Sequence, residues 1–188
     1  MRTIAVVVIC SGLALAQAPT DRGRERIERA VRSEVLKLPY YGPFDWITFQ
    51  LDGYKVTLNG LVSRPTLKTD SERVVKKIEG VESVTNNIEV LPLSPNDDRL
   101  RNELWRAILG HPTMLHYAIR GPNSPIHILV KNGNVWLEGY VAFESEKNIA
   151  GLQANGVPGV FKVTNNLQVD APAVKKMKVK MPKKKPSA

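Results

Sequence analysis

The sequence has a single cysteine, Cys10, and only 3 histidines among its 188 residues. Cys10 lies in an N-terminal apolar segment that we expect to be removed, so the remaining chain has no disulfide and no cysteine nucleophile or metal ligand. His111 and His116 flank Pro112 outside a helical i, i+4 pair, and neither a phosphate-binding glycine loop nor a G-x-S-x-G sequence occurs. We therefore expect no enzyme activity, no cofactor and no metal site.

Most of the chain also lacks an excess of either charge, although the formal net charge is +9. Residues 17–174 hold 19 Lys and Arg against 18 Asp and Glu, a net charge of +1. This balance argues against a nucleic-acid partner. The excess sits in a tail, residues 173–188, that we predict to be disordered, and its cations are Lys175, Lys176, Lys178, Lys180, Lys183, Lys184 and Lys185. The tail is either a solvated end of the chain or a tether to an anionic membrane.

A long apolar run occurs only at the N-terminus, where residues 4–16 follow Arg2. The run is too short for a spanning helix with its flanks and ends in small residues, so residues 1–16 are typical of a secretory signal peptide. We expect cleavage after Ala16 and a periplasmic or secreted protein that begins at Gln17. A lipoprotein signal would need a small residue before Cys10, and Ile9 stands there.

Two copies of one unit make up the rest of the chain. A shift of 79 positions aligns residues 47–90 with 126–169 without a gap, and 13 of the 44 pairs are identical. The V-T-N-N run at residues 84–87 returns at 163–166. We therefore predict two tandem domains, at residues 21–92 and 95–171.

Each copy has the same predicted order of elements, α-β-β-α-β. The periodicity predicts a helix over 21–37, strands over 47–51 and 56–62, a helix from Pro65 to Gly80 and a strand over 84–90. The second copy repeats them with a helix after Ser94, strands over 126–130 and 135–141, a helix over 144–154 and a strand over 160–169. It also carries six additional residues within 111–122. The expected fold is α+β, with a small three-stranded sheet and two helices on one face in each unit.

Two sequence patterns resemble the BON domain family. Residues 56–62 and 135–141 are similar to its V-x-L-x-G-x-V signature, and residues 80–88 and 159–167 resemble its G-V-x-x-V-x-N ending. The resemblance implies a periplasmic osmotically-induced-type protein that acts in envelope maintenance or stress and, as in some members, binds anionic phospholipid. The Lys-rich tail and the glycine and proline near the last helix depart from the family's pattern.

The candidate lipid-binding residues lie in the second copy and the tail. Arg101, Trp105 and Leu109 form a stripe at i, i+4 and i+8, which suits a bilayer interface if it is exposed; Trp105 could instead widen the buried face. Arg120, in the inserted segment, would extend this surface, and the seven tail lysines would add to it. As an alternative function, a sheet edge or the inserted segment would bind an envelope protein.

The paired asparagines and the glycines inside strands are better explained by structure than by a ligand. Asparagine bonds locally to the backbone, which would help the chain enter the last strand at Asn86 and Asn165. Gly60 and Gly139 need only a close approach of another backbone.

Overall fold

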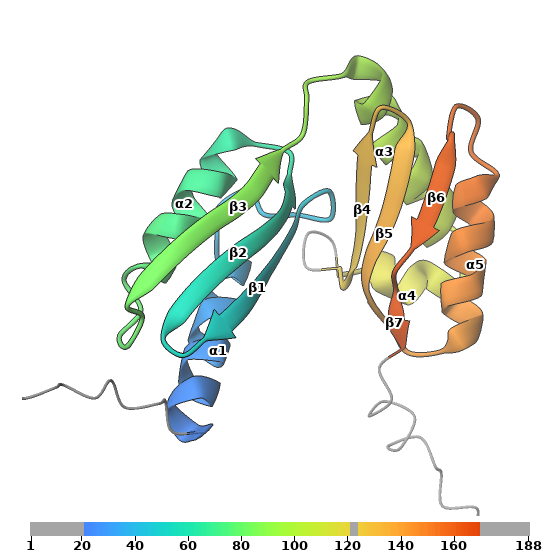
Figure 1. Ribbon diagram of the computed structural model, residues 1–188. Coiled ribbons are helices and arrows are strands. Elements are labelled where there is room, and N and C mark those ends of the chain that lie inside the picture. Colours follow the sequence, from blue (N-terminus) through green and yellow to red (C-terminus); the bar gives the residue numbers. More distant parts are fainter. Residues whose placement is uncertain (1–20, 121–123, 170–188) are drawn as a thin grey trace, which may run out of the picture.

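The computed structural model describes residues 21–120 and 124–169, which form two α-β-β-α-β units (Figure 1). Repeat 1 consists of α1 (Asp21–Leu36), β1 (Trp46–Asp52), β2 (Lys55–Val62), α2 (Pro65–Val75) and β3 (Ser83–Val90). Repeat 2 consists of α3 (Pro95–Leu109), η1 (Pro112–Met114), α4 (Leu115–Ala118), β4 (Ile126–Lys131), β5 (Asn134–Val141), α5 (Glu144–Asn155), β6 (Lys162–Asn165) and β7 (Gln168–Val169). The predicted α+β fold is confirmed. The expected signal peptide and the Lys-rich tail lie outside the described residues.

The second strand of each hairpin is the centre of its sheet. β2 pairs antiparallel with β1 and parallel with β3, and β5 pairs in the same way with β4 and with β6 and β7. A parallel pair needs a crossover, which α2 and α5 supply. The two long helices of a repeat cover one face of its sheet (Figure 1), and the edges are β1 and β3 in repeat 1, and β4 and the β6–β7 side in repeat 2.

Each repeat has its own apolar core. In repeat 1 the predicted spacing of four residues on α1 places Ile27, Val31 and Val35 in the interior against Leu58 of the sheet. Leu100, Leu104 and Ile108 of α3 do the same in repeat 2. Burial of each such side chain stabilises the fold by about 1.5–3 kcal/mol, so the helix stripes supply much of the driving force for folding.

The repeated asparagines share two bonds in both repeats, as the structural interpretation predicts, and Asn86 also donates to the Glu72 carboxylate (3.1 Å). The Asn86 side chain donates to the carbonyl of Lys68 (2.8 Å), and that of Asn165 donates to the carbonyl of Lys147 (2.7 Å). Their side-chain oxygens accept from the backbone N–H two residues on, at 3.1 Å and 3.3 Å. Each asparagine thus ties the last strand of its repeat to the preceding helix.

The close backbone approach expected at the strand glycines is also present. A Cβ on Gly60 would lie 1.9 Å from the carbonyl oxygen of Trp46, and one on Gly139 would lie 1.9 Å from that of Pro125. Their φ angles of +141° and +109° disfavour any other residue as well. Neither glycine needs a ligand to explain it.

Three elements differ from the predicted ones. α2 ends at Val75, before the Gly80 at which it was expected to end. The last strand of repeat 2 is divided into β6 and β7, with residues 166–167 between them, although both parts pair with β5 in the same register. The inserted segment, expected as a loop, contains η1 and α4. Met114 and Tyr117 from these short helices are buried in the core of repeat 2, so the insertion has fixed positions in the fold.

Candidate functional site

The helix stripe on α3 that was predicted to contact lipid is largely buried. Arg101 is 5% exposed and Leu109 1% exposed, while Trp105 is half-buried and packs edge-on against Phe44 of repeat 1, with the ring centroids 6.2 Å apart. The prediction of an exposed interfacial stripe on α3 is therefore wrong. The alternative, in which Trp105 widens the buried face, agrees with the structure.

A short segment of repeat 1 covers this part of repeat 2. The carbonyl of Pro43 accepts a hydrogen bond from the N–H of Ile128 on β4 (2.7 Å), so the chain before β1 runs against the edge of β4. Arg101 spans the same region, because its Nη2 donates to the carbonyl of Val130 (2.8 Å) and its Nη1 pairs with Asp98. The sequence of one repeat cannot reveal the contacts of Trp105 and Ile128 with Phe44 and Pro43, since these partners belong to the other repeat.

His127 lies at the contact between the repeats. Its ring is 4.7 Å from that of Trp46 and 5.7 Å from that of Tyr41, and its Nδ1 lies 3.2 Å from the carbonyl oxygen of Gly42. A carbonyl only accepts, so Nδ1 carries the proton in this contact. Burial lowers the pKa of His127 from its ordinary 6.5 to about 4. The imidazole is therefore neutral at pH 7 and holds the two repeats together as a ring and a donor.

A buried carboxylate anchors the inserted segment of repeat 2. Glu146, 3% exposed at the start of α5, accepts from the hydroxyl of Tyr117 (2.8 Å) and from the N–H of Ala142 (2.9 Å). Burial and the Glu146 carboxylate raise the pKa of Tyr117 to about 12, so the hydroxyl keeps its proton and stays a donor. These bonds hold α4 against the body of the repeat.

The outer side of the inserted segment is apolar and basic. Leu115 is 48% and Ile119 86% exposed, and Arg120 is exposed beside them. Of the predicted lipid-binding residues, Arg120 is thus accessible, whereas Arg101 and Leu109 are not. The seven tail lysines lie outside the described residues.

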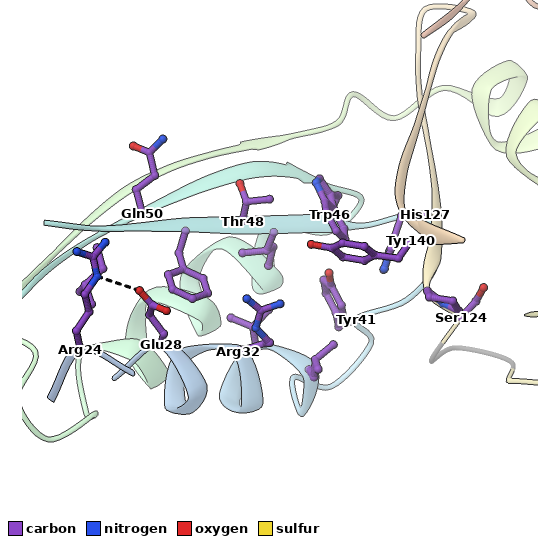
Figure 2. Close-up of a pocket in the computed structure, with 16 residues that line it drawn as sticks. Arg24, Glu28, Arg32, Tyr41, Trp46, Thr48, Gln50, Ser124, His127 and Tyr140 are labelled. Atoms are coloured by element: carbon purple, nitrogen blue, oxygen red, sulfur yellow. Dashed lines mark hydrogen bonds and ion pairs between the residues drawn. The ribbon is translucent and has the colours of Figure 1, made fainter. Parts of the chain in front are cut away.

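A groove of about 850 Å³ lies between α1 and β1 of repeat 1, and repeat 2 closes one end of it. Figure 2 shows Arg24, Glu28 and Arg32 projecting from α1 toward the strand, with Tyr41 and His127 at the closed end. This groove was not among the predicted sites. The repeat was the one feature of the sequence that pointed to these residues. It aligns Glu28, Arg32 and Leu36 of repeat 1 with the helix stripe of repeat 2 that was predicted to bind lipid.

Two further features bear on function. Over residues 21–120 and 124–169, His, Asp and Glu side chains do not cluster in groups of three or more that could hold a metal ion. Within the same ranges, no helix has the length and apolar character that crossing a membrane requires.

The fold and the accessible surfaces define a tandem α+β protein built from two copies of a small helix-covered sheet. The BON domain family model matches residues 23–92 and again residues 96–171, and the chain belongs to this family, with two BON domains in tandem. BON domains are known in envelope-associated proteins.

Comparisons with individual proteins are weaker. No curated protein matches the chain significantly. Among solved structures, CdsD, a structural protein of the Type III secretion system of Chlamydia trachomatis, is 16% identical, with 85% of this chain and 98% of that chain covered and a TM-score of 0.27. The C-terminal domain of CdsD is 16% identical, with coverage of 77% and 96% and a TM-score of 0.28. Values this low carry no functional argument.

Proposed function

We propose that this chain is an exported, non-catalytic protein of the cell envelope that binds anionic phospholipid surfaces in envelope maintenance or stress. The observation that supports it most is the outer side of the inserted segment, where Ile119 is 86% and Leu115 48% exposed beside Arg120. Large apolar side chains next to a cation suit the boundary between headgroups and acyl chains. The seven lysines of the tail would add cations that attract anionic headgroups.

The energies of this contact are modest and depend on salt. Burial of an exposed isoleucine or leucine in the acyl boundary contributes about 1.5–3 kcal/mol, and each cation near an anionic surface about 1 kcal/mol. The lysines alone would give attraction that salt screens within a Debye length. The apolar side chains would give the part of the affinity that survives physiological salt.

Co-sedimentation with vesicles tests the proposal. The chain from Gln17 to Ala188 is mixed with anionic or with neutral phosphatidylcholine vesicles, at low and at physiological salt. We expect binding to anionic vesicles only, weakened by removal of residues 173–188 and by Ile119→Glu. Failure to bind anionic vesicles at low salt would overturn the proposal.

Two control variants make the test specific for the inserted segment. Leu152→Glu places the same charge on an exposed position of α5, where the leucine is 72% exposed, and we expect it to bind as the unaltered chain does. Trp105→Ala removes a half-buried ring of α3. It should lower the free energy of unfolding and leave the vesicle affinity of the folded protein unchanged. Loss of binding with Trp105→Ala in a folded protein, with Ile119→Glu unaffected, would place the lipid contact on α3 instead.

A further inference from the structure

The edge of β4 in repeat 2 is covered by groups from outside its sheet. Ile128 and Val130 are the β4 residues whose backbone groups point away from β5, because such positions alternate along an antiparallel pair. The N–H of Ile128 donates to the carbonyl of Pro43 (2.7 Å), and the carbonyl of Val130 accepts from Arg101 (2.8 Å). This edge thus binds other parts of the same chain through its backbone.

The corresponding edge of β1 in repeat 1 is open. The shift of 79 places Phe49 at the position of Ile128, and it places Leu51 at that of Val130, with the same register to the central strand. The outward backbone groups of Phe49 and Leu51 form no hydrogen bond with the part of the chain that the structure describes. Repeat 1 therefore presents backbone donors and acceptors with which another strand can pair.

The two edges differ because the neighbouring helices differ. In repeat 2 the guanidinium of Arg101 on α3 reaches the edge carbonyl. The residue of α1 that aligns with it is Glu28, whose carboxylate cannot donate a hydrogen bond and instead accepts one from Arg24 (3.1 Å). The exchange of an arginine for a glutamate leaves the edge of β1 without the side chain that covers β4.

Repeat 2 closes the end of the groove that is farther from the free edge residues. Figure 2 shows Ser124 and His127 beside Trp46 at the closed end, while Gln50 and Arg24 lie toward the other end. The two free edge residues flank Gln50 in β1, so they lie toward the open end as well.

The helix side of the groove presents a cation and an apolar side chain. Arg32 is exposed and lines the groove, and its guanidinium makes no ion pair or hydrogen bond with the described residues. Leu36, four residues further along α1, is 56% exposed and lines the same groove. Four residues of a helix rise about 6 Å, and alternate side chains of a strand are about 6.6 Å apart. An acidic and an apolar side chain two residues apart on a strand beside β1 therefore match Arg32 and Leu36.

The free backbone groups favour a peptide over an acyl chain in this groove. An acyl chain would remove water from the N–H and carbonyl groups of Phe49 and Leu51 without replacing its hydrogen bonds, which costs free energy. A peptide strand replaces those bonds, as the carbonyl of Pro43 does for Ile128 in repeat 2.

We propose that the groove between α1 and β1 binds an extended segment of a partner protein, which adds as a strand to the edge of β1. The segment has acidic and apolar side chains at alternate positions, so that a carboxylate meets Arg32 and an apolar group covers Leu36. Recognition of this kind takes its affinity from main-chain hydrogen bonds and its selectivity from side-chain contacts. The site is separate from the outer side of the inserted segment and does not depend on lipid binding.

Synthetic peptides test the proposal on the chain from Gln17 to Ala188. The probe is T-E-T-V-T-E-T with both ends blocked, which presents the acidic and apolar residues in either strand direction. We expect saturable shifts of the backbone amide signals of Phe49 and Leu51 by NMR. The signals of Ile128 and Val130 should not move, because their edge is already covered. The matched peptide T-K-T-V-T-K-T should bind more weakly.

Two changes separate strand pairing from charge attraction. N-methylation of every second peptide residue removes the donors along one edge of the peptide strand, so methylation of one alternate set should abolish binding and methylation of the other should preserve it. Arg32→Glu should weaken binding of the acidic peptide by roughly three- to tenfold and strengthen that of the lysine peptide. Arg29→Glu, the same charge change at an exposed position of α1 outside the groove, should leave the preference for the acidic peptide unchanged.

Three results would refute the proposal. They are the absence of shifts at Phe49 and Leu51 with millimolar acidic peptide, equal binding of the acidic and lysine peptides, and equal binding of the two N-methylated sets. Saturable shifts with laurate below its micelle concentration, without shifts from the peptide, would assign the groove to an acyl chain instead. Vesicle binding enters none of these measurements, so the peptide site and the lipid contact are tested separately.

Discussion

Acidification should separate the two repeats by charging His127. In the folded chain this imidazole is 6% exposed, stacks near Trp46 and Tyr41, and has a pKa lowered by burial from 6.5 to about 4. The unfolded chain therefore binds a proton at His127 between these two values while the folded chain does not. Stability falls as pH falls through that window, and it is fully retained above about 6.5.

The size of the loss follows from the width of the window. A difference of about 2.5 pKa units, at 1.36 kcal/mol each, corresponds to a loss of about 3 kcal/mol between pH 6.5 and pH 4. Burial also raises the pKa of Asp45. Its effect on stability has the opposite sign, because just above the usual pKa of an aspartate the folded chain binds more protons than the unfolded chain, so stability there rises as pH falls. Comparison with a His127→Gln variant, in which Asp45 is kept, isolates the contribution of the histidine.

Two measurements check this prediction. The ring proton shifts of His127, followed by NMR, give its pKa directly, and urea unfolding followed by tryptophan fluorescence gives stability at each pH. We expect the difference in stability between the unaltered chain and His127→Gln to shrink by about 3 kcal/mol from pH 6.5 to pH 4. An imidazole that titrates near 6.5, or parallel losses in both proteins, would refute the buried neutral contact.

Two further predictions concern bonds that fix the fold of each repeat. Asp97, 1% exposed, accepts from the N–H groups of Asn132 (2.8 Å) and Gly133 (3.0 Å), so Asp97→Ala should lower the free energy of unfolding by about 2–4 kcal/mol. Asp97→Asn, which keeps one acceptor, should cost less in the same urea titration. Asn86→Ala and Asn165→Ala should each cost about 1–2 kcal/mol, because both lose the bonds to the preceding helix and to the backbone two residues on, and Asn86→Ala should cost the more of the two, because Asn86 also donates to the Glu72 carboxylate (3.1 Å). A cost confined to one of the two asparagines would contradict the structural role of the bonds they share.

The sequence predicts features that each repeat determines by itself. The spacing of Ile27, Val31 and Val35 follows from burial of one helix face, and Gly60 and Gly139 follow from contacts inside one sheet. These relations are local or recur at a fixed shift, so periodicity and self-comparison reveal them.

Contacts between the repeats could not be predicted in the same way. Trp105 has the pattern of an exposed amphipathic surface, yet Phe44 from the other repeat packs on it, and Pro43 bonds to the nearby edge of β4. No period in the sequence relates those positions. The open groove could not be predicted either, because the sequence does not distinguish an exposed Leu36 from a leucine that another part of the chain covers.

The position of the docking contact along the chain bears on the order in which the repeats fold during synthesis. β3 pairs with β2 through partners as distant in sequence as Lys55 and Ser83, so repeat 1 can complete its sheet once Val90 is available. The edge of β4, on which Pro43 docks, is synthesised later. Until then a nascent chain presents a folded first repeat whose docking segment has no acceptor strand of its own. Crowded nascent chains are thus most exposed to misassembly in the interval between completion of the two repeats.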